Sequence, residues 1–203
     1  MSPRRAAALR NSDDDRGLRE HLIATAQRLL AEQGAAGLTV RAIARAAGVA
    51  DGVLYNHFAD KEELLTAALR AHVDAQHRAL GPLPGAGTAT VAENLRTYLR
   101  AGLALHRAVI PVFAGLLATP AVLTRFAESE EHDQDWRNVL ARYLAAERDL
   151  GRLAPAADLE AALAVLVGVC HDRALTALLP GTPHTPADVP AVVTTLLTGI
   201  GPA

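Results

Sequence analysis

The sequence predicts an all-α protein, in which a small N-terminal domain of three helices precedes a larger helical bundle. The chain has 203 residues and half of them are apolar, which is enough to bury a core of its own. Apolar residues recur every three or four positions along most of the chain, as they do on the buried face of a helix. We find no run with the strict alternation that is typical of a half-buried strand.

Local signals place the first helices. Four are expected, at residues 18–33, 39–47, 50–57 and 60–80. Thr39 is a good N-cap for the second helix, and Gly48 ends that helix because glycine enters the left-handed conformation without steric cost. Asp60, followed three positions later by Glu63, forms a capping box for the fourth helix. We therefore divide the chain into an N-terminal arm (1–17), a small helical domain (18–63) and a larger second domain (64–203).

The second domain is also expected to be helical. The segment 81–87 is rich in proline and glycine and predicts a linker. Thr90 and Glu93 form another capping box. Further helices are expected at 109–117, 128–150 and 155–179, and a last one that begins with Thr185, Pro186 and an acid at Asp188.

The charge of the chain is unevenly distributed. Its net charge is −2, yet residues 1–61 contain nine Arg or Lys against seven Asp or Glu, a balance of +2. Arg4, Arg5 and Arg10 form a basic arm, which either touches phosphates or is a solvated tail beside Asp13 to Asp15. A basic N-terminal part is compatible with a nucleic-acid partner.

The composition also restricts where the protein works. Cys170 is the only cysteine, so no internal disulfide can form, which fits the cytoplasm. The longest apolar run, residues 161–170, is about half of the roughly 20 residues that a membrane span needs, and no export signal is found. We expect a soluble cytoplasmic protein without a membrane partner. Cys170 lies in the most apolar helix and is read as a small core residue rather than a redox switch.

Two short helices joined by a glycine turn, after a longer one, are typical of a helix-turn-helix. Ala44 lies four residues before Gly48, where a small side chain lets the two helices cross closely. Ile43, Val49 and Leu54 supply the apolar contacts of that crossing. The motif predicts binding to double-stranded DNA.

The whole stretch LTVRAIARAAGVADGVLYNHFADKEELL, Leu38–Leu65, closely resembles the TetR family of transcriptional regulators. The resemblance covers roughly residues 18–66. It implies an N-terminal DNA-binding domain and a C-terminal domain that binds a small-molecule effector and forms a homodimer. It further implies release from a palindromic operator when the effector binds, so that the protein acts as a repressor. It places DNA contacts at Thr39, Arg41, Arg45, Ala50, Asp51, Gly52, Val53, Tyr55, Asn56, His57 and Lys61.

The residue types suit these roles. Tyr55 and His57 can donate hydrogen bonds to phosphate oxygens. Lys61 adds charge to a helix N-terminus that already favours anions. The alternative is that Tyr55 and Phe58 are core aromatic residues and that His57 and Lys61 are ordinary polar surface residues. Ala50 and Val53 stand where the family often has serine or threonine, which favours contact with thymine methyl groups. Asp51 either stabilises the helix N-terminus or accepts from cytosine.

The second domain holds most of the aromatic residues and several polar ones. Candidate ligand-binding residues are Asn94, Tyr98, His106, Phe113, Trp136 and His171, which either line an apolar pocket with a few polar groups or belong to an ordinary core. The last two helices carry more apolar surface than one small domain can cover, which favours a dimer. The expected interface residues are Val189, Val192, Val193, Leu196, Leu197 and Ile200.

Enzymatic activity is not expected. The sequence has no glycine-rich phosphate loop and no nucleophile arranged with histidine and acid, and its histidines have no compact metal-ligand spacing. We therefore expect no metal and no cofactor. The alternative to a regulator is a helical binding or adaptor module whose helix-turn-helix is vestigial.

Overall fold

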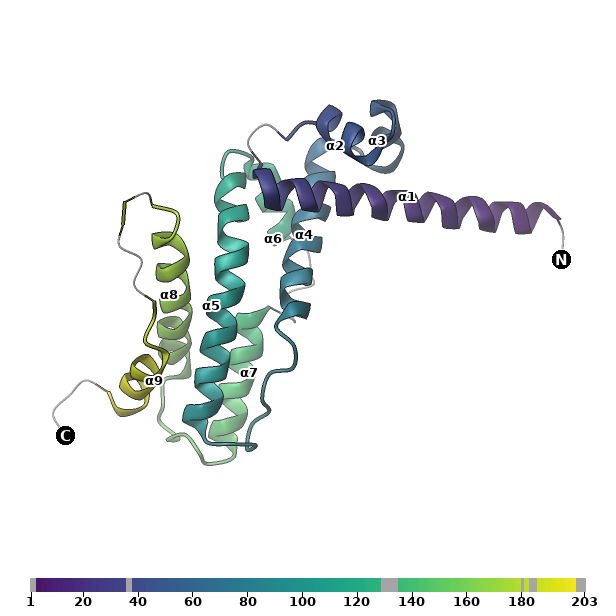
Figure 1. The fold of residues 1–203 in the computed structure, drawn as a ribbon. Helices are drawn as coiled ribbons and strands as arrows, with labels where there is room; N and C mark the ends of the chain where they lie inside the picture. Colours follow the sequence, from purple (N-terminus) through teal and green to yellow (C-terminus); the bar gives the residue numbers. More distant parts are fainter. Residues whose placement is uncertain (1–2, 36–37, 129–134, 180, 183–185, 200–203) are drawn as a thin grey trace. The chain divides into compact units, whose positions relative to one another are not determined.

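The computed structural model describes residues 3–35, 38–128, 135–179, 181–182 and 186–199, with side chains from residue 15 onward. Within these ranges the chain is helical and contains no strand, which confirms the predicted fold class (Figure 1). The helices are α1 (Pro3–Gln33), α2 (Val40–Ala47), α3 (Asp51–His57), α4 (Lys61–Ala79), α5 (Val91–Leu116), α6 (Pro120–Ala127), α7 (Trp136–Asp149), α8 (Leu159–Thr176) and α9 (Val189–Thr198).

The chain divides into two compact units that each have a core. Unit 1 consists of residues 1–74 and 112–129, and unit 2 of residues 75–111 and 130–203. Helices α4 and α5 each begin in one unit and end in the other. In this division residues 112–128 group with the N-terminal helices, whereas the sequence suggested boundaries after residues 17 and 63.

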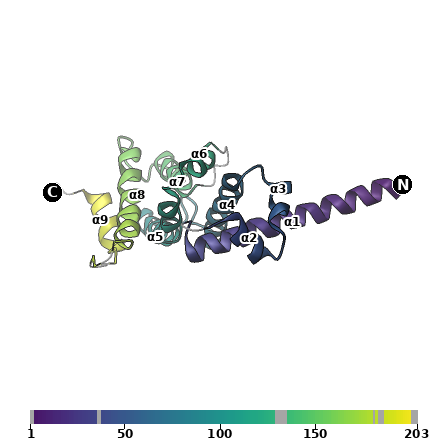
Figure 2. The same cartoon turned by 90° about the horizontal axis from the view of Figure 1, so that it is seen from above.

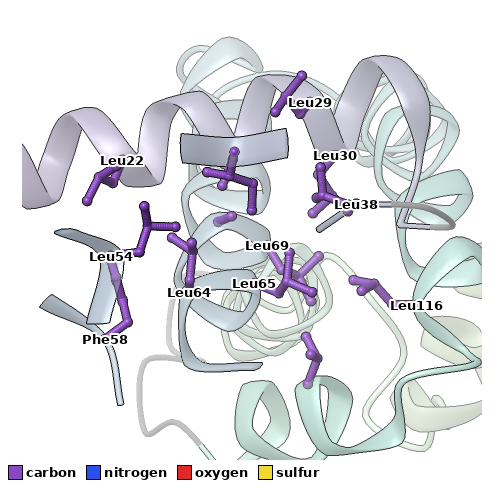
Figure 3. Packing of buried hydrophobic residues seen from close by; sticks show 14 of the residues in the cluster. Leu22, Leu29, Leu30, Leu38, Leu54, Phe58, Leu64, Leu65, Leu69 and Leu116 are labelled. Atoms are coloured by element: carbon purple, nitrogen blue, oxygen red, sulfur yellow. The ribbon is translucent and has the colours of Figure 1, made fainter. Parts of the chain in front are cut away.

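The core of unit 1 is formed mainly by leucines that point inward from several helices. Figure 3 shows Leu30 of α1 close to Leu65 and Leu69 of α4, with Leu116 from the end of α5 beside them and Leu22 farther along α1. All five side chains are at most 1% exposed. Burying a leucine fully stabilises a fold by about 1.5–3 kcal/mol, so this core holds the helix-turn-helix on α1 and α4.

Unit 2 has a second core, built by α5, α7, α8 and α9. Its buried members include Leu99 of α5, Leu140 of α7, Leu166 of α8 and Val193 of α9. Figures 1 and 2 both show α9 lying against α8. Glu147 of α7 is also completely buried and accepts a hydrogen bond from the backbone N–H of Gly87 at 3.3 Å, which ties the 80–90 segment to α7.

Several helix starts are where the sequence predicts them. The hydroxyl of Thr39 accepts from the N–H of Ala42 at 3.1 Å, as a side-chain N-cap does. Thr90 and Glu93 form the reciprocal capping box, at 3.1 and 3.2 Å. Each of these hydrogen bonds joins residues three positions apart, so the residue types alone predict them.

Other boundaries differ from the prediction. Helix α1 begins at Pro3 and includes most of the expected arm, because its first turns are rich in alanine and arginine, which are good helix formers. Helix α5 runs unbroken through Pro111, where a separate helix from 109 was expected. Helices α7 and α9 begin later than predicted, and the N-cap of α9 is Asp188 rather than Thr185, which lies outside the described residues.

One helix of the described ranges, α5, is long and apolar enough to cross a membrane, with a mean hydropathy of 1.3 over its best window. Its apolar residues are used inside the protein. Leu95, Leu99 and Leu105 are buried in the core of unit 2, and Val112 and Leu116 in the core of unit 1. These five residues contribute to the two cores, and 28% of the apolar window is buried inside the structure.

Candidate nucleic-acid interface and sensing site

The turn between α2 and α3 has the geometry that a helix-turn-helix requires. Gly48 has φ 73° and ψ 26°, a left-handed conformation that costs a residue with a side chain about 1–2 kcal/mol. The N–H of Val49 donates to the carbonyl of Ala44 at 3.0 Å, which closes the end of α2. Ile43, Ala44 and Leu54 are at most 2% exposed, so the two helices are fixed to each other by buried contacts.

This packing leaves the start of α3 on the surface. Ala50, Asp51 and Gly52 are exposed and Val53 is partly exposed, and Arg45 is exposed at the end of α2. The carboxylate of Asp51 lies 3.3 Å from Nε of Arg41, while α3 has no side-chain N-cap bond. Asp51 therefore orients Arg41 instead of capping its own helix by a hydrogen bond.

The end of α3 carries the tyrosine and histidine that the sequence singled out. Tyr55 is 60% exposed and Asn56 is exposed as well. The side chain of His57 is only 6% exposed, and its Nε2 lies 3.6 Å from a carboxylate oxygen of Asp15 on α1. Tyr55 is thus accessible to a phosphate, whereas Asp15 is the anion beside His57 in this conformation.

The N-terminus of α4 is held by a network that the sequence predicts only in part. Asp60 accepts from the N–H of Glu63 at 2.7 Å, and Glu63 accepts from the N–H of Ala59 at 2.8 Å. Arg125 of α6 donates two hydrogen bonds to the Asp60 carboxylate, at 2.6 and 2.8 Å. Bidentate pairs of this kind have a defined geometry, so α6 fixes the residue that directly precedes Lys61.

The Arg125 guanidinium lowers the pKa of Asp60 from 3.8 to about 2, mainly through its hydrogen bonds. A carboxylate whose pKa is lowered on folding stabilises the fold above its unfolded pKa, and this stabilisation is lost as the pH falls through about 2. We expect Arg125→Ala to raise the pKa of Asp60 toward its ordinary value, as followed by NMR titration of the carboxyl carbon. Arg137→Ala is the control, because Arg137 pairs with Glu160 in unit 2. An unchanged Asp60 titration in Arg125→Ala would contradict the assignment.

Residues 22–68 match the sequence model of the family described as bacterial regulatory proteins, tetR family, and this span contains the turn and both short helices. Residues 22–68 are therefore similar to the DNA-binding domain of the TetR family. It is 29% identical over 148 residues to the transcriptional repressor KstR2 of Mycobacterium tuberculosis, covering 70% of this chain and 72% of that protein.

Several solved structures share the fold. The transcriptional regulator FadR of Bacillus subtilis, solved with stearoyl-CoA, is 20% identical, and the match covers 90% of this chain and 99% of that chain with a TM-score of 0.59. The multidrug binding protein EbrR, solved with imidazole, is 29% identical, covers 91% and 96%, and has a TM-score of 0.52. The chain is a DNA-binding transcriptional regulator, and the relatives that it matches are regulators.

Three of the predicted ligand residues come together in unit 2. The rings of His106 and Trp136 meet edge to face with centroids 5.4 Å apart, and those of His106 and His171 are 4.9 Å apart. They come from α5, α7 and α8. Trp136 is 2% exposed, whereas His171 is exposed, so the cluster extends from the core of unit 2 to its surface.

The other predicted ligand residues lie elsewhere. Tyr98 stacks on Tyr143, with centroids 4.6 Å apart, and its hydroxyl donates to the carbonyl of Pro84. Asn94 is buried as well. The burial of Tyr143 itself raises the pKa of its hydroxyl well above the usual range. Phe113 does not join either group, because it contacts Phe126 within unit 1.

Cys170 is 1% exposed, as expected for a core residue. Burial raises the pKa of its thiol to about 12. A thiol with so high a pKa stays protonated near neutral pH and is a poor nucleophile. The structure therefore favours the core interpretation of this cysteine over the redox switch.

Proposed function

We propose that this regulator is a cytoplasmic repressor that binds a palindromic operator as a homodimer and leaves it when a small molecule occupies unit 2. The observation that carries the proposal is the surface at the start of α3. It is exposed, held by a buried helix crossing, and flanked by accessible hydrogen-bond donors. The first residues of such a helix enter the major groove in helix-turn-helix proteins.

The DNA contacts are assigned by accessibility and chemistry. Thr39, Arg41, Tyr55 and Lys61 contact phosphates, which fix the register of docking. His57 joins them if a phosphate replaces Asp15 beside its ring. Bases are read by Arg45 and by the start of α3, with Asn56 beside it, where the small side chains of Ala50 and Val53 suit thymine methyl groups.

The dimer is proposed to form through unit 2. Helix α8 is buried on one face yet exposes Val165 and Leu175 on another, 49% and 52% accessible. On α9, Leu197 is 41% exposed. Val189 and Val193 are buried in the core of unit 2 itself, Val192 and Leu196 pack against that core, and Ile200 lies outside the described residues. We therefore assign the interface mainly to α8 and to Leu197.

Ligand binding is proposed to reach the DNA through the helices that belong to both units. Helix α4 carries Lys61 at its start in unit 1 and ends in unit 2, and α5 leads directly to α6, whose Arg125 holds Asp60. A ligand that favours another arrangement of these helices shifts Lys61. Coupling of this kind is typically about 1–3 kcal/mol.

Binding of the full chain to the DNA upstream of its own gene tests the proposed function. A gel shift and a footprint should show two half-sites about one helical turn apart, or a multiple of it. A helical adaptor with a vestigial motif would bind that DNA no better than unrelated DNA of the same length. A footprint over one asymmetric half-site would contradict the dimer.

Lys61→Ala is expected to weaken binding to all DNA sequences alike. Each lysine that leaves a phosphate lowers the salt dependence of log K by about one unit. Titrations at several salt concentrations measure this slope for operator and for unrelated DNA. Arg28→Ala, which removes a charge paired with Glu32 on α1, is the control. If Lys61→Ala altered base preference and kept the slope, Lys61 would be a base contact.

A further inference from the structure

The indole N–H of Trp136 is an unusual group in the core of unit 2. Trp136 is the first residue of α7 and is 2% exposed. Its ring packs on the backbone of α5 at Gly102, and its Nε1 has no hydrogen-bond partner within the described ranges. A buried donor without a partner is costly, and proteins usually satisfy such groups. The N–H is thus available to an acceptor on a ligand.

The neighbouring ring offers the complementary group. Nδ1 of His106 lies 2.7 Å from the carbonyl oxygen of Gly102. Because a carbonyl can only accept, Nδ1 carries the hydrogen and Nε2 is left as the acceptor. Burial lowers the pKa of His106, and the nearby His171 and His77 act in the same direction, whereas the hydrogen bond to Gly102 and the charge of Asp135 act to raise this pKa. The imidazole is therefore neutral near pH 7.

We propose that this cluster binds a neutral apolar molecule through a hydroxyl group, as a phenol or an alcohol. The hydroxyl oxygen accepts from Nε1 of Trp136, and its hydrogen is donated to Nε2 of His106. The proposal rests on the proposed function, because it names the chemical class of the effector in unit 2.

The chemistry of the two groups selects a hydroxyl among the common polar groups. A hydroxyl is both donor and acceptor, whereas a carboxylate only accepts and would face the lone pair of His106. Trp136 belongs to the apolar cluster that contains Leu99, Leu140 and Val167. The body of the ligand must therefore be apolar, since a second charged or polar group would be buried there without a partner.

Trp136 is the only tryptophan of the chain, so its fluorescence reports directly on this cluster. We would titrate the full chain, without DNA, with phenol, toluene and benzoate, and confirm affinities by calorimetry. Phenol is expected to change the emission saturably and to bind at least about tenfold more tightly than either of the others. Equal affinities for phenol and toluene, or no saturable binding of phenol, would overturn the proposal.

Variants of His106 separate recognition of the hydroxyl from general packing. His106→Phe keeps a ring but removes the acceptor, and should bring phenol and toluene to similar affinity. His106→Gln restores an acceptor and should recover part of the preference. Tyr143→Phe removes a hydroxyl from the separate stack of Tyr98 and Tyr143, and should leave the preference for phenol over toluene unchanged. A preference that persists in His106→Phe would exclude the assignment.

These titrations distinguish two kinds of failure. They contain no DNA, so a negative result with phenol leaves operator binding to be judged by the footprint alone. Saturable phenol binding without any operator binding would support the cluster and contradict the repressor. Far-UV circular dichroism of each variant confirms that the loss of preference does not come from unfolding.

Discussion

Gly102→Ala is expected to destabilise unit 2 by about 2 kcal/mol or more, in the range of overpacked core substitutions. A Cβ at this position would overlap the Trp136 ring, at 2.7 Å from Cε2 and 2.8 Å from Cη2, with a third ring carbon closer still. Trp136 is a rigid side chain on the first turn of α7 and is almost fully buried. It cannot yield without moving the start of that helix. Thermal or urea unfolding, followed by the fluorescence of Trp136, measures the effect.

The matched control is Gly17→Ala. Gly17 also lies within a helix, but a Cβ there meets nothing within 4 Å. Alanine is about 1 kcal/mol better than glycine in a helix interior, so this variant should be neutral or more stable. If Gly102→Ala were equally stable, Trp136 would not pack on α5 as described, and the hydroxyl site proposed for Trp136 and His106 would lose its basis.

The sequence predicts those parts of the fold that depend on neighbouring residues. The caps at Thr39 and Thr90 and the turn at Gly48 involve atoms a few positions apart, so the residue types suffice. The continuity of α5 through Pro111 was not predicted, because a proline inside a helix removes a hydrogen bond and usually ends or kinks it. Here Leu105 and Val112, on either side, are buried in different cores, and this tertiary packing stabilises the helix.

The candidate sites, like the fold, could be predicted only where they depend on residues close in sequence. The exposed start of α3 follows from the helix-turn-helix pattern, but the bidentate pair of Arg125 with Asp60 joins residues 65 positions apart and has no local signal. Sequence reasoning named His106, Trp136 and His171 as candidates by type alone. It could not distinguish them from Phe113, which packs in the other unit, because that difference arises only from how α5 is shared between the two cores.

Val165→Glu is expected to separate the proposed dimer and to weaken operator binding by about 100-fold or more. Val165 is 49% exposed on α8, so glutamate is solvated in the monomer and folding stability should change little. In the dimer the carboxylate would be buried against apolar side chains without a partner, which is strongly unfavourable. Sedimentation equilibrium and gel shifts on the operator measure the two effects.

The affinity for the operator falls because the α3 helices of the two subunits are no longer joined in one dimer. When the subunits are joined, docking of one α3 presents the second to its half-site at an effective concentration that a free monomer does not reach. Leu117→Glu is the control, because Leu117 is 71% exposed and belongs to unit 1, whereas α8 belongs to unit 2. If Val165→Glu stayed dimeric, α8 would not be the interface. If it became monomeric and kept its operator affinity, each subunit would bind DNA independently.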